Sequence, residues 1–147
     1  MKHRLLAAAS MMLLVTTAHA ADDAALAPFT QFVDATNAGD TAKAASAYAP
    51  TVTIIDEFGP HIWSSYASWS RDLAADFKAN AVTDFHMAAA PASFKKIDDK
   101  TGYGVVPTVL TYKVKGKPIS EKGLFTVSTA KGAKGWRITG WAWSTTP

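Results

Sequence analysis

A break between two helical patterns, followed by an apolar strand that ends on acids, constrains the fold of this chain most strongly. Gly39 and Asp40 form the break, because glycine suits the position after a helix and aspartate can cap the next one. An alanine-rich helix is predicted over about Thr41–Tyr48 and a strand over Val52–Asp56, with Glu57 next. Acids are poor strand formers and unfavourable to bury, so this pair indicates the mouth of a pocket.

The first twenty residues have the pattern of a secretory leader. They combine a basic start, an apolar run over residues 5–15 and a small-x-small cleavage site that ends at Ala20. The run is too short to span a bilayer, and no second long run follows. We therefore expect residues 1–20 to be a signal peptide and residues 21–147 to be one domain, periplasmic or secreted and with no membrane association after cleavage.

Composition excludes several classes of function. The chain has no cysteine, so thiolate chemistry and iron–sulfur clusters are excluded, and the core alone must hold the domain together. The formal charge of +3 falls towards neutral when the basic leader is removed, and no basic stripe remains. We expect neither a nucleic-acid partner nor a cofactor.

Hydrophobic periodicity predicts three helices and then a meander of strands. The first helix should begin near Asp22 and Asp23 and end at Asn37, and Pro50 should stop the second. The third should follow a Ser64 or Ser65 cap and carry an apolar stripe of Tyr66, Trp69, Leu73 and Phe77. Strands are predicted over 83–97, with a break near Pro91, and over 103–115, 119–129 and 136–143. This order indicates an α+β fold with its helices on one sheet face.

The order of elements resembles the nuclear transport factor 2-like superfamily, which includes SnoaL-like proteins and ketosteroid isomerase. The likeness covers about Ala24–Ser144 and is clearest over Gly39–Asp56 and in the closing Gly135–Trp143. It implies a cone, in which three N-terminal helices pack on a strongly bent, mostly antiparallel sheet and leave a pocket open at one end. Because members of the superfamily often pair through the open sheet face, a homodimer is one expected arrangement.

Asp56 is the first candidate for chemistry. By strand alternation it shares a side with Val52, Ile54 and Phe58, whereas Glu57 points the other way. Desolvation on an apolar side raises the pKa of a carboxyl towards a value useful for proton transfer. The resemblance places Asp56 where ketosteroid isomerase carries its general base. Its alternatives are a pocket-lining role and a strand-end role, in which it accepts backbone hydrogen bonds in the next turn.

The same resemblance argues against steroid isomerase activity. The isomerase stabilises its oxyanion with a tyrosine and a protonated aspartic acid, and these positions fall at Phe32 and about Gly123 here. Neither residue has a side chain that donates a hydrogen bond. Loss of one such donor typically lowers the rate on the order of 10²–10³-fold, so we expect negligible activity by that mechanism.

Glu121 is the second candidate for chemistry. It shares the apolar face of its strand with Phe125, so it could form an acid–base couple with Asp56. The alternative is a buried glutamate paired with Arg71, Arg137 or a lysine, because an unpaired buried charge is unfavourable.

A further set of side chains, most of them aromatic, is expected to line the pocket. Ligand sites are usually apolar and aromatic with a few polar groups, which histidines can supply. The set comprises Phe58, His61, Trp63, Trp69, His86, Tyr112, Phe125, Trp141 and Trp143. The alternative is that these aromatic residues simply form the core, because core and pocket lie on the same sheet face. The histidine spacing matches no metal motif, so no metal site is expected.

These patterns favour an exported SnoaL-like domain whose partner is a small, largely apolar molecule. A first alternative is an acid–base enzyme of isomerase or dehydratase type with Asp56 as the base. A second is a non-catalytic interaction module that dimerises.

Overall fold

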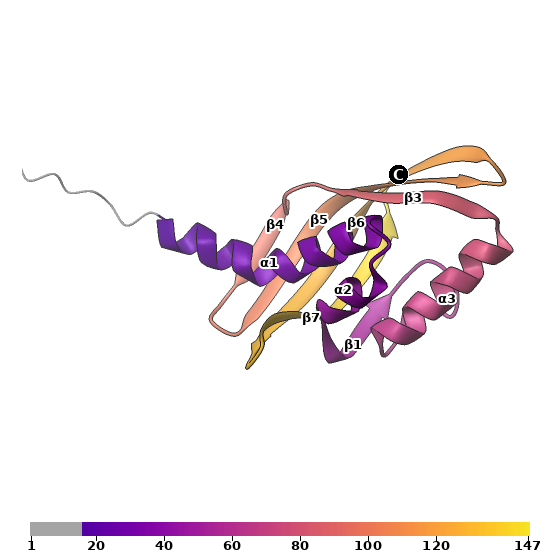
Figure 1. Ribbon diagram of the computed structural model, residues 1–147. Helices are drawn as coiled ribbons and strands as arrows, with labels where there is room; N and C mark the ends of the chain where they lie inside the picture. Colours follow the sequence, from indigo (N-terminus) through magenta and orange to yellow (C-terminus); the bar gives the residue numbers. More distant parts are fainter. Residues whose placement is uncertain (1–15) are drawn as a thin grey trace, which may run out of the picture.

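The computed structural model describes the backbone of residues 16–147 and the side chains of residues 24–147 (Figure 1). Residues 1–15 of the predicted leader lie outside the described residues, and the predicted cleavage site falls within the first helix. The described helices are α1 (Thr16–Asn37), α2 (Thr41–Ser46) and α3 (Tyr66–Ala79). Among them, none is both long enough and apolar enough to cross a membrane.

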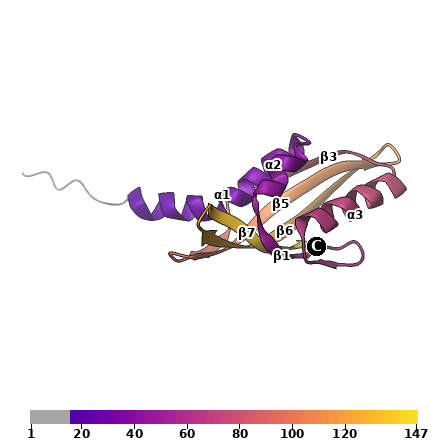
Figure 2. The ribbon, with the colours of Figure 1, turned by 60° about the horizontal axis from the view of Figure 1, so that its bottom comes forward.

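The strands form one sheet, as Figure 2 shows from below. Their order is β2-β1-β7-β6-β5-β3, and β4 pairs with β5 beside β3. Every pair is antiparallel except β1 with β7. The strands are β1 (Tyr48–Ile55), β2 (Ile62–Trp63), β3 (Val82–Ala89), β4 (Phe94–Ile97), β5 (Thr101–Val114), β6 (Lys117–Gly132) and β7 (Gly135–Thr145). The helices lie on one face of this curved sheet, which confirms the predicted α+β class (Figures 1 and 2).

Two caps set the helix starts where the sequence predicts them. Gly39 has φ +70°, a conformation that glycine adopts without a Cβ penalty. The Asp40 carboxylate then accepts a hydrogen bond from the Lys43 amide at 2.9 Å. The Ser65 hydroxyl accepts one from the Ser68 amide at 3.1 Å and begins α3.

Two predicted boundaries are wrong. The first helix begins at Thr16, earlier than expected, because the alanine-rich segment before Asp22 continues it favourably. The second ends at Ser46, so Tyr48 and Pro50 belong to β1. The β1–β7 register is irregular between Tyr48 and Thr53, and Pro50, which has no N–H to donate, lies in that irregular segment.

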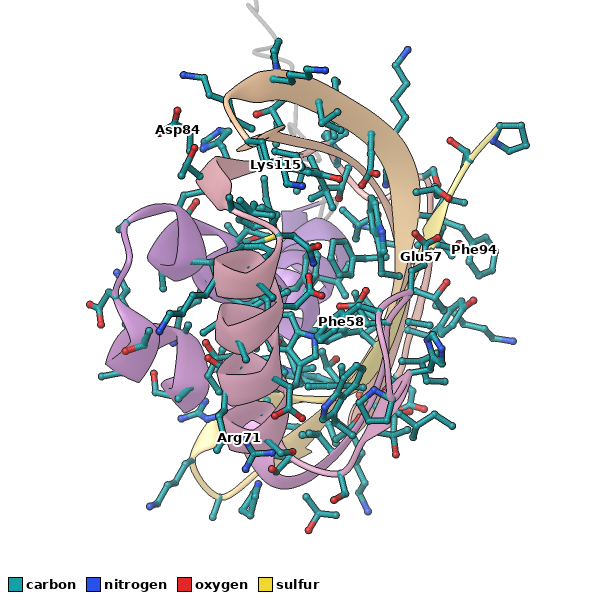
Figure 3. All side chains as sticks on the ribbon, turned by 90° about the vertical axis from the view of Figure 1, so that its right-hand side faces the viewer. Glu57, Phe58, Arg71, Asp84, Phe94 and Lys115 are labelled. Carbon is teal, nitrogen blue, oxygen red and sulfur yellow. The ribbon has the colours of Figure 1, made fainter. Side chains whose placement is uncertain are left out.

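The core lies between α1 and the concave face of the sheet. Its most completely buried large apolar side chains come from one helix and three strands, namely Phe32, Ile54, Val127 and Ile138. Burial alternates along β5, β6 and β7, since successive side chains of a strand point to opposite faces. Figure 3 shows the curved sheet wrapping around α3, with Phe58 between them and Phe94 on the outer side.

Candidate functional site

A cavity of about 280 Å³ lies between the helices and the concave face of the sheet. Its volume lies just below the usual range for ligand pockets, roughly 300–1,000 Å³. Aromatic and aliphatic side chains make most of its wall, and carboxylates are interspersed among them. The lining residues are Phe32, Thr36, Asp56, Glu57, Phe58, Trp69, Leu73, Asp76, Phe77, Phe85, Met87, Leu110, Tyr112, Glu121, Phe125 and Trp143.

Asp56 contributes a carboxylate to this wall directly after β1. Its Oδ2 accepts a hydrogen bond from Nε1 of Trp69 at 2.9 Å, and its Oδ1 accepts one from the amide of Glu57 at 2.8 Å. The pKa of Asp56 is raised above its ordinary value of 3.8, chiefly by burial. The two hydrogen bonds lower the pKa and the nearby charges of Glu57 and Asp76 raise it, but both effects are smaller than that of burial. The result is a half-buried carboxyl that is held in place by two hydrogen bonds and whose pKa is raised chiefly by burial.

The loop that carries Asp56 is fixed by aromatic packing. Phe58 lies against Trp63, with ring centroids 4.7 Å apart, and Nε1 of Trp63 donates to Asp72 of α3 at 2.9 Å. The amide of Asp56 donates to the carbonyl oxygen of His61 at 3.0 Å and closes the loop. The β1–β2 turn is therefore anchored to α3, and this anchor holds Asp56 at the cavity.

Glu57 also lines the cavity, which corrects the prediction that it points away. Strand alternation does not apply to it, because β1 ends at Ile55 and the chain then bends. Its Oε1 accepts hydrogen bonds from the amide and the hydroxyl of Thr145, at 2.6 and 3.0 Å. These bonds tie the loop after β1 to the end of β7.

Tyr112 and Glu121 reach the cavity from the sheet. Glu121 pairs in register with Leu110, so Tyr112, two residues along β5 on the same face, is its diagonal neighbour. The pKa of Tyr112 is raised to about 12. Burial is the largest cause, followed by the hydrogen bond to Glu121, the charge of Glu121 and the charge of Glu57. The predicted alternative of an arginine partner for Glu121 is not realised, because Arg71 pairs with Asp72 and Arg137 bonds the carbonyl oxygen of Trp136.

Four residues expected at the pocket do not line it. His61 is exposed on the β1–β2 turn, and His86 is exposed on β3, where Phe85 and Met87 on either side of it face the cavity. Trp63 lies behind Phe58, as described above. Trp141 is core: Phe32, Trp69 and Phe125 surround its ring. No group of three or more His, Asp or Glu side chains in the described part of the chain could hold a metal ion.

Several wall residues have no sequence signal that would mark them as pocket residues. Leu73 and Phe77 stand in the α3 stripe that was recognised, and Asp76 is seven residues after Trp69, so helical spacing places it on the same face. Thr36 and Phe32 come from α1, and the rest are Phe85, Met87 and Leu110. The Thr36 hydroxyl oxygen is buried and has no hydrogen-bond partner among the described residues, a feature that no sequence pattern predicts.

Comparisons with known proteins identify the fold. No protein-family model matches the chain, and no curated protein does. A solved structure from Kribbella flavida matches with a TM-score of 0.74 at 15% identity, over 88% of this chain and 93% of that one. An NTF2-like protein with a cystatin-like fold from Novosphingobium aromaticivorans matches with a TM-score of 0.68 at 11% identity, over 86% and 82%. A ketosteroid isomerase-like protein from Erwinia carotovora atroseptica gives 0.68 at 14%, over 86% and 97%. The chain has the nuclear transport factor 2-like (NTF2-like) fold.

Within this NTF2-like fold, the two positions compared with the isomerase's oxyanion donors are apolar and closed. Phe32 is fully buried and packs edge-on against Trp69 and Tyr48. A Cβ at Gly123 would lie 2.5 Å from Cη2 of Trp143 and would also clash with the carbonyl oxygen of Ser144. The absence of a side chain at Gly123 therefore lets the Trp143 indole approach the β6 backbone closely, and an aspartate does not fit there.

Proposed function

We propose that this chain binds a small, largely apolar molecule in the cavity between its helices and its sheet. The observation that carries the proposal is a hollow walled by aromatic rings that also holds the oriented Asp56 carboxyl. Such a combination, an apolar wall with few fixed polar groups, is typical of small-molecule sites.

Mass spectrometry of the natively purified protein tests this proposal. Leu110 lines the cavity and is 8% exposed, so Leu110→Trp fills the hollow, whereas Thr111→Trp adds the same side chain on the exposed outer face. We expect a small-molecule adduct on the wild type and on Thr111→Trp, and none on Leu110→Trp. An equal adduct on Leu110→Trp, or none on all three proteins, would contradict the proposal.

A second candidate is proton transfer with Asp56 as the base and Glu121 as a second acid–base group. It is supported by the raised pKa of Asp56 and by the position of both carboxyls on one cavity. The enclosed Phe32 and Gly123 positions lead us to expect no turnover of a β,γ-unsaturated ketosteroid above the buffer rate. For any carbonyl compound that the enzyme does turn over, Asp56→Asn should abolish turnover and preserve binding.

A third candidate is self-association through the outer sheet face. Large apolar side chains are exposed there, with Ile55 at 43%, Ile62 at 65% and Phe94 at 55%. Sedimentation velocity tests this candidate, because Ile62→Lys should convert a dimer to a monomer. A wild type that is monomeric at every concentration would exclude it.

Export is a separate proposal, supported by the sequence pattern of residues 1–20. N-terminal sequencing of the protein from a periplasmic extract should begin at Ala21, and an intact N-terminus would contradict export by a cleaved leader.

A further inference from the structure

The wall of the cavity carries negative charge from three sides. Asp56 and Glu57 follow β1, Asp76 comes from α3, and Glu121 comes from β6. No lysine, arginine or histidine is among the lining residues in the described part of the chain. The hollow is therefore acidic as well as aromatic.

Basic side chains in the described part of the chain do not pair with these carboxylates. In the described residues the ion pairs join Arg71 to Asp72 and Lys113 to Asp84, and neither acid lines the cavity. Asp56, Glu57 and Asp76 instead accept hydrogen bonds from neutral groups, and Glu121 interacts with the neutral Tyr112 phenol. None of these partners supplies a compensating positive charge, so the wall disfavours an anionic ligand.

The aromatic rings point to the same class of ligand. The rings of Trp69, Trp143, Phe58, Tyr112 and Phe125 line the cavity, and the face of such a ring carries a negative quadrupole that attracts an organic cation. The carboxylates do not converge as a metal site does, because no three acidic or histidine side chains in the described chain lie close enough to share an ion. A diffuse charge on an apolar body suits this wall better than a bare ion.

We propose that the ligand of this cavity is a protonated amine carried on an apolar body about the size of one ring. This inference rests on the proposed small-molecule site and specifies the chemical class that the site selects. The carboxylates of the wall attract the ammonium group, and the aromatic faces enclose the apolar body.

Isothermal titration of the full-length protein with three matched probes tests the inference. The probes are 2-phenylethylamine, 2-phenylethanol and phenylacetate, which share a ring and differ chiefly in charge. At neutral pH and low salt we expect the amine to bind roughly tenfold more tightly than the alcohol, and phenylacetate to bind most weakly. Added salt should weaken binding of the amine and leave the alcohol unchanged.

Charge-matched variants show where the preference comes from. Glu121→Gln removes one negative charge from the wall, whereas Asp84→Asn removes one from an exposed ion pair outside it. Glu121→Gln should bring the amine-to-alcohol ratio towards one, and Asp84→Asn should preserve it. An unchanged ratio in Glu121→Gln, or equal loss in both variants, would overturn the assignment of the preference to the cavity.

The two proposals fail in different ways. If the alcohol binds as tightly as the amine, or more tightly, the amine inference is wrong and the apolar-ligand site still stands. If none of the three probes binds, both proposals are wrong.

Discussion

Two adjoining regions lie between the helices and the concave sheet face, a closed end around Trp141 and a cavity end around Asp56, and they contain the same kinds of aromatic residue but satisfy their polar groups differently. At the closed end, Nε1 of Trp141 donates to the hydroxyl of Tyr48 at 2.8 Å, and both side chains are buried. At the cavity end, Nε1 of Trp69 donates to a half-buried carboxylate that also borders open space. The difference is that the polar groups at the closed end satisfy one another, whereas the carboxylates at the cavity end have no basic partner among the described residues.

The largest expected effect lies at the closed end. Trp141→Ala should lower the free energy of unfolding by about 3–5 kcal/mol, because it leaves a large void among Phe32, Trp69 and Phe125. Trp143→Ala should lower it less, since one side of that indole already borders the cavity. Urea unfolding measures both. A loss for Trp143→Ala equal to or larger than that for Trp141→Ala would break the distinction between core and cavity.

A smaller effect is expected from the Tyr48 hydroxyl. Tyr48→Phe leaves the Trp141 indole N–H without its partner in a buried site, which should lower the free energy of unfolding by about 1–3 kcal/mol. Burial raises the pKa of the Tyr48 phenol well above 10.0, so this loss should be constant from pH 5 to pH 9. Urea unfolding at several pH values checks it, and a neutral substitution would show that the closed end is not held by this bond.

The smallest effect is expected at the cavity. Asp56→Asn should keep the fold and change the free energy of unfolding at pH 7 by less than about 1 kcal/mol, because the carboxyl borders open space. Since the folded-state pKa of Asp56 is raised, its favourable contribution is present below pH 3.8 and is lost as the pH rises through that folded-state pKa. As the pH rises through the folded-state pKa of Asp56, the free energy of unfolding of Asp56→Asn should therefore increase relative to that of the wild type. A large fall in melting temperature at pH 7 would instead indicate a structural role.

The sequence predicted those parts of the fold that depend on local chemistry. Asp40 and Ser65 are recognisable caps, and the i, i+3, i+7, i+11 stripe of α3 is a helical period, so both could be located without coordinates. Tyr48 was misplaced because the alanine-rich run before it continues a helical pattern, and its pairing with Ile138 of β7 is a long-range contact. Such pairings decide local ambiguities and are invisible in a single sequence.

The site was predictable only in part, for a related reason. Strand alternation predicted that the Asp56 side chain lies on the same side as Val52 and Ile54, and Asp56 does line the cavity. The same rule failed for Glu57, because β1 ends at Ile55 and the chain bends so that Glu57 lines the cavity too. Trp141 and Trp143 share one face of β7, and only the rings that pack around Trp141 separate core from wall. Which of two inward-facing residues borders a void depends on packing in three dimensions rather than on periodicity.

A carboxyl titration by NMR shows whether the Asp56 side chain faces a desolvated hollow. Asp98 is an internal control, because hydrogen bonds from the Thr101 hydroxyl and from the backbone of Lys100 and Thr101 lower its pKa below 3.8. We predict that the carboxyl carbon of Asp56 titrates above pH 3.8 and that of Asp98 below pH 3.8. In the outer-face control Thr111→Trp, Asp56 should still titrate at a higher pH than Asp98. A midpoint for Asp56 at or below that of Asp98 would contradict the account.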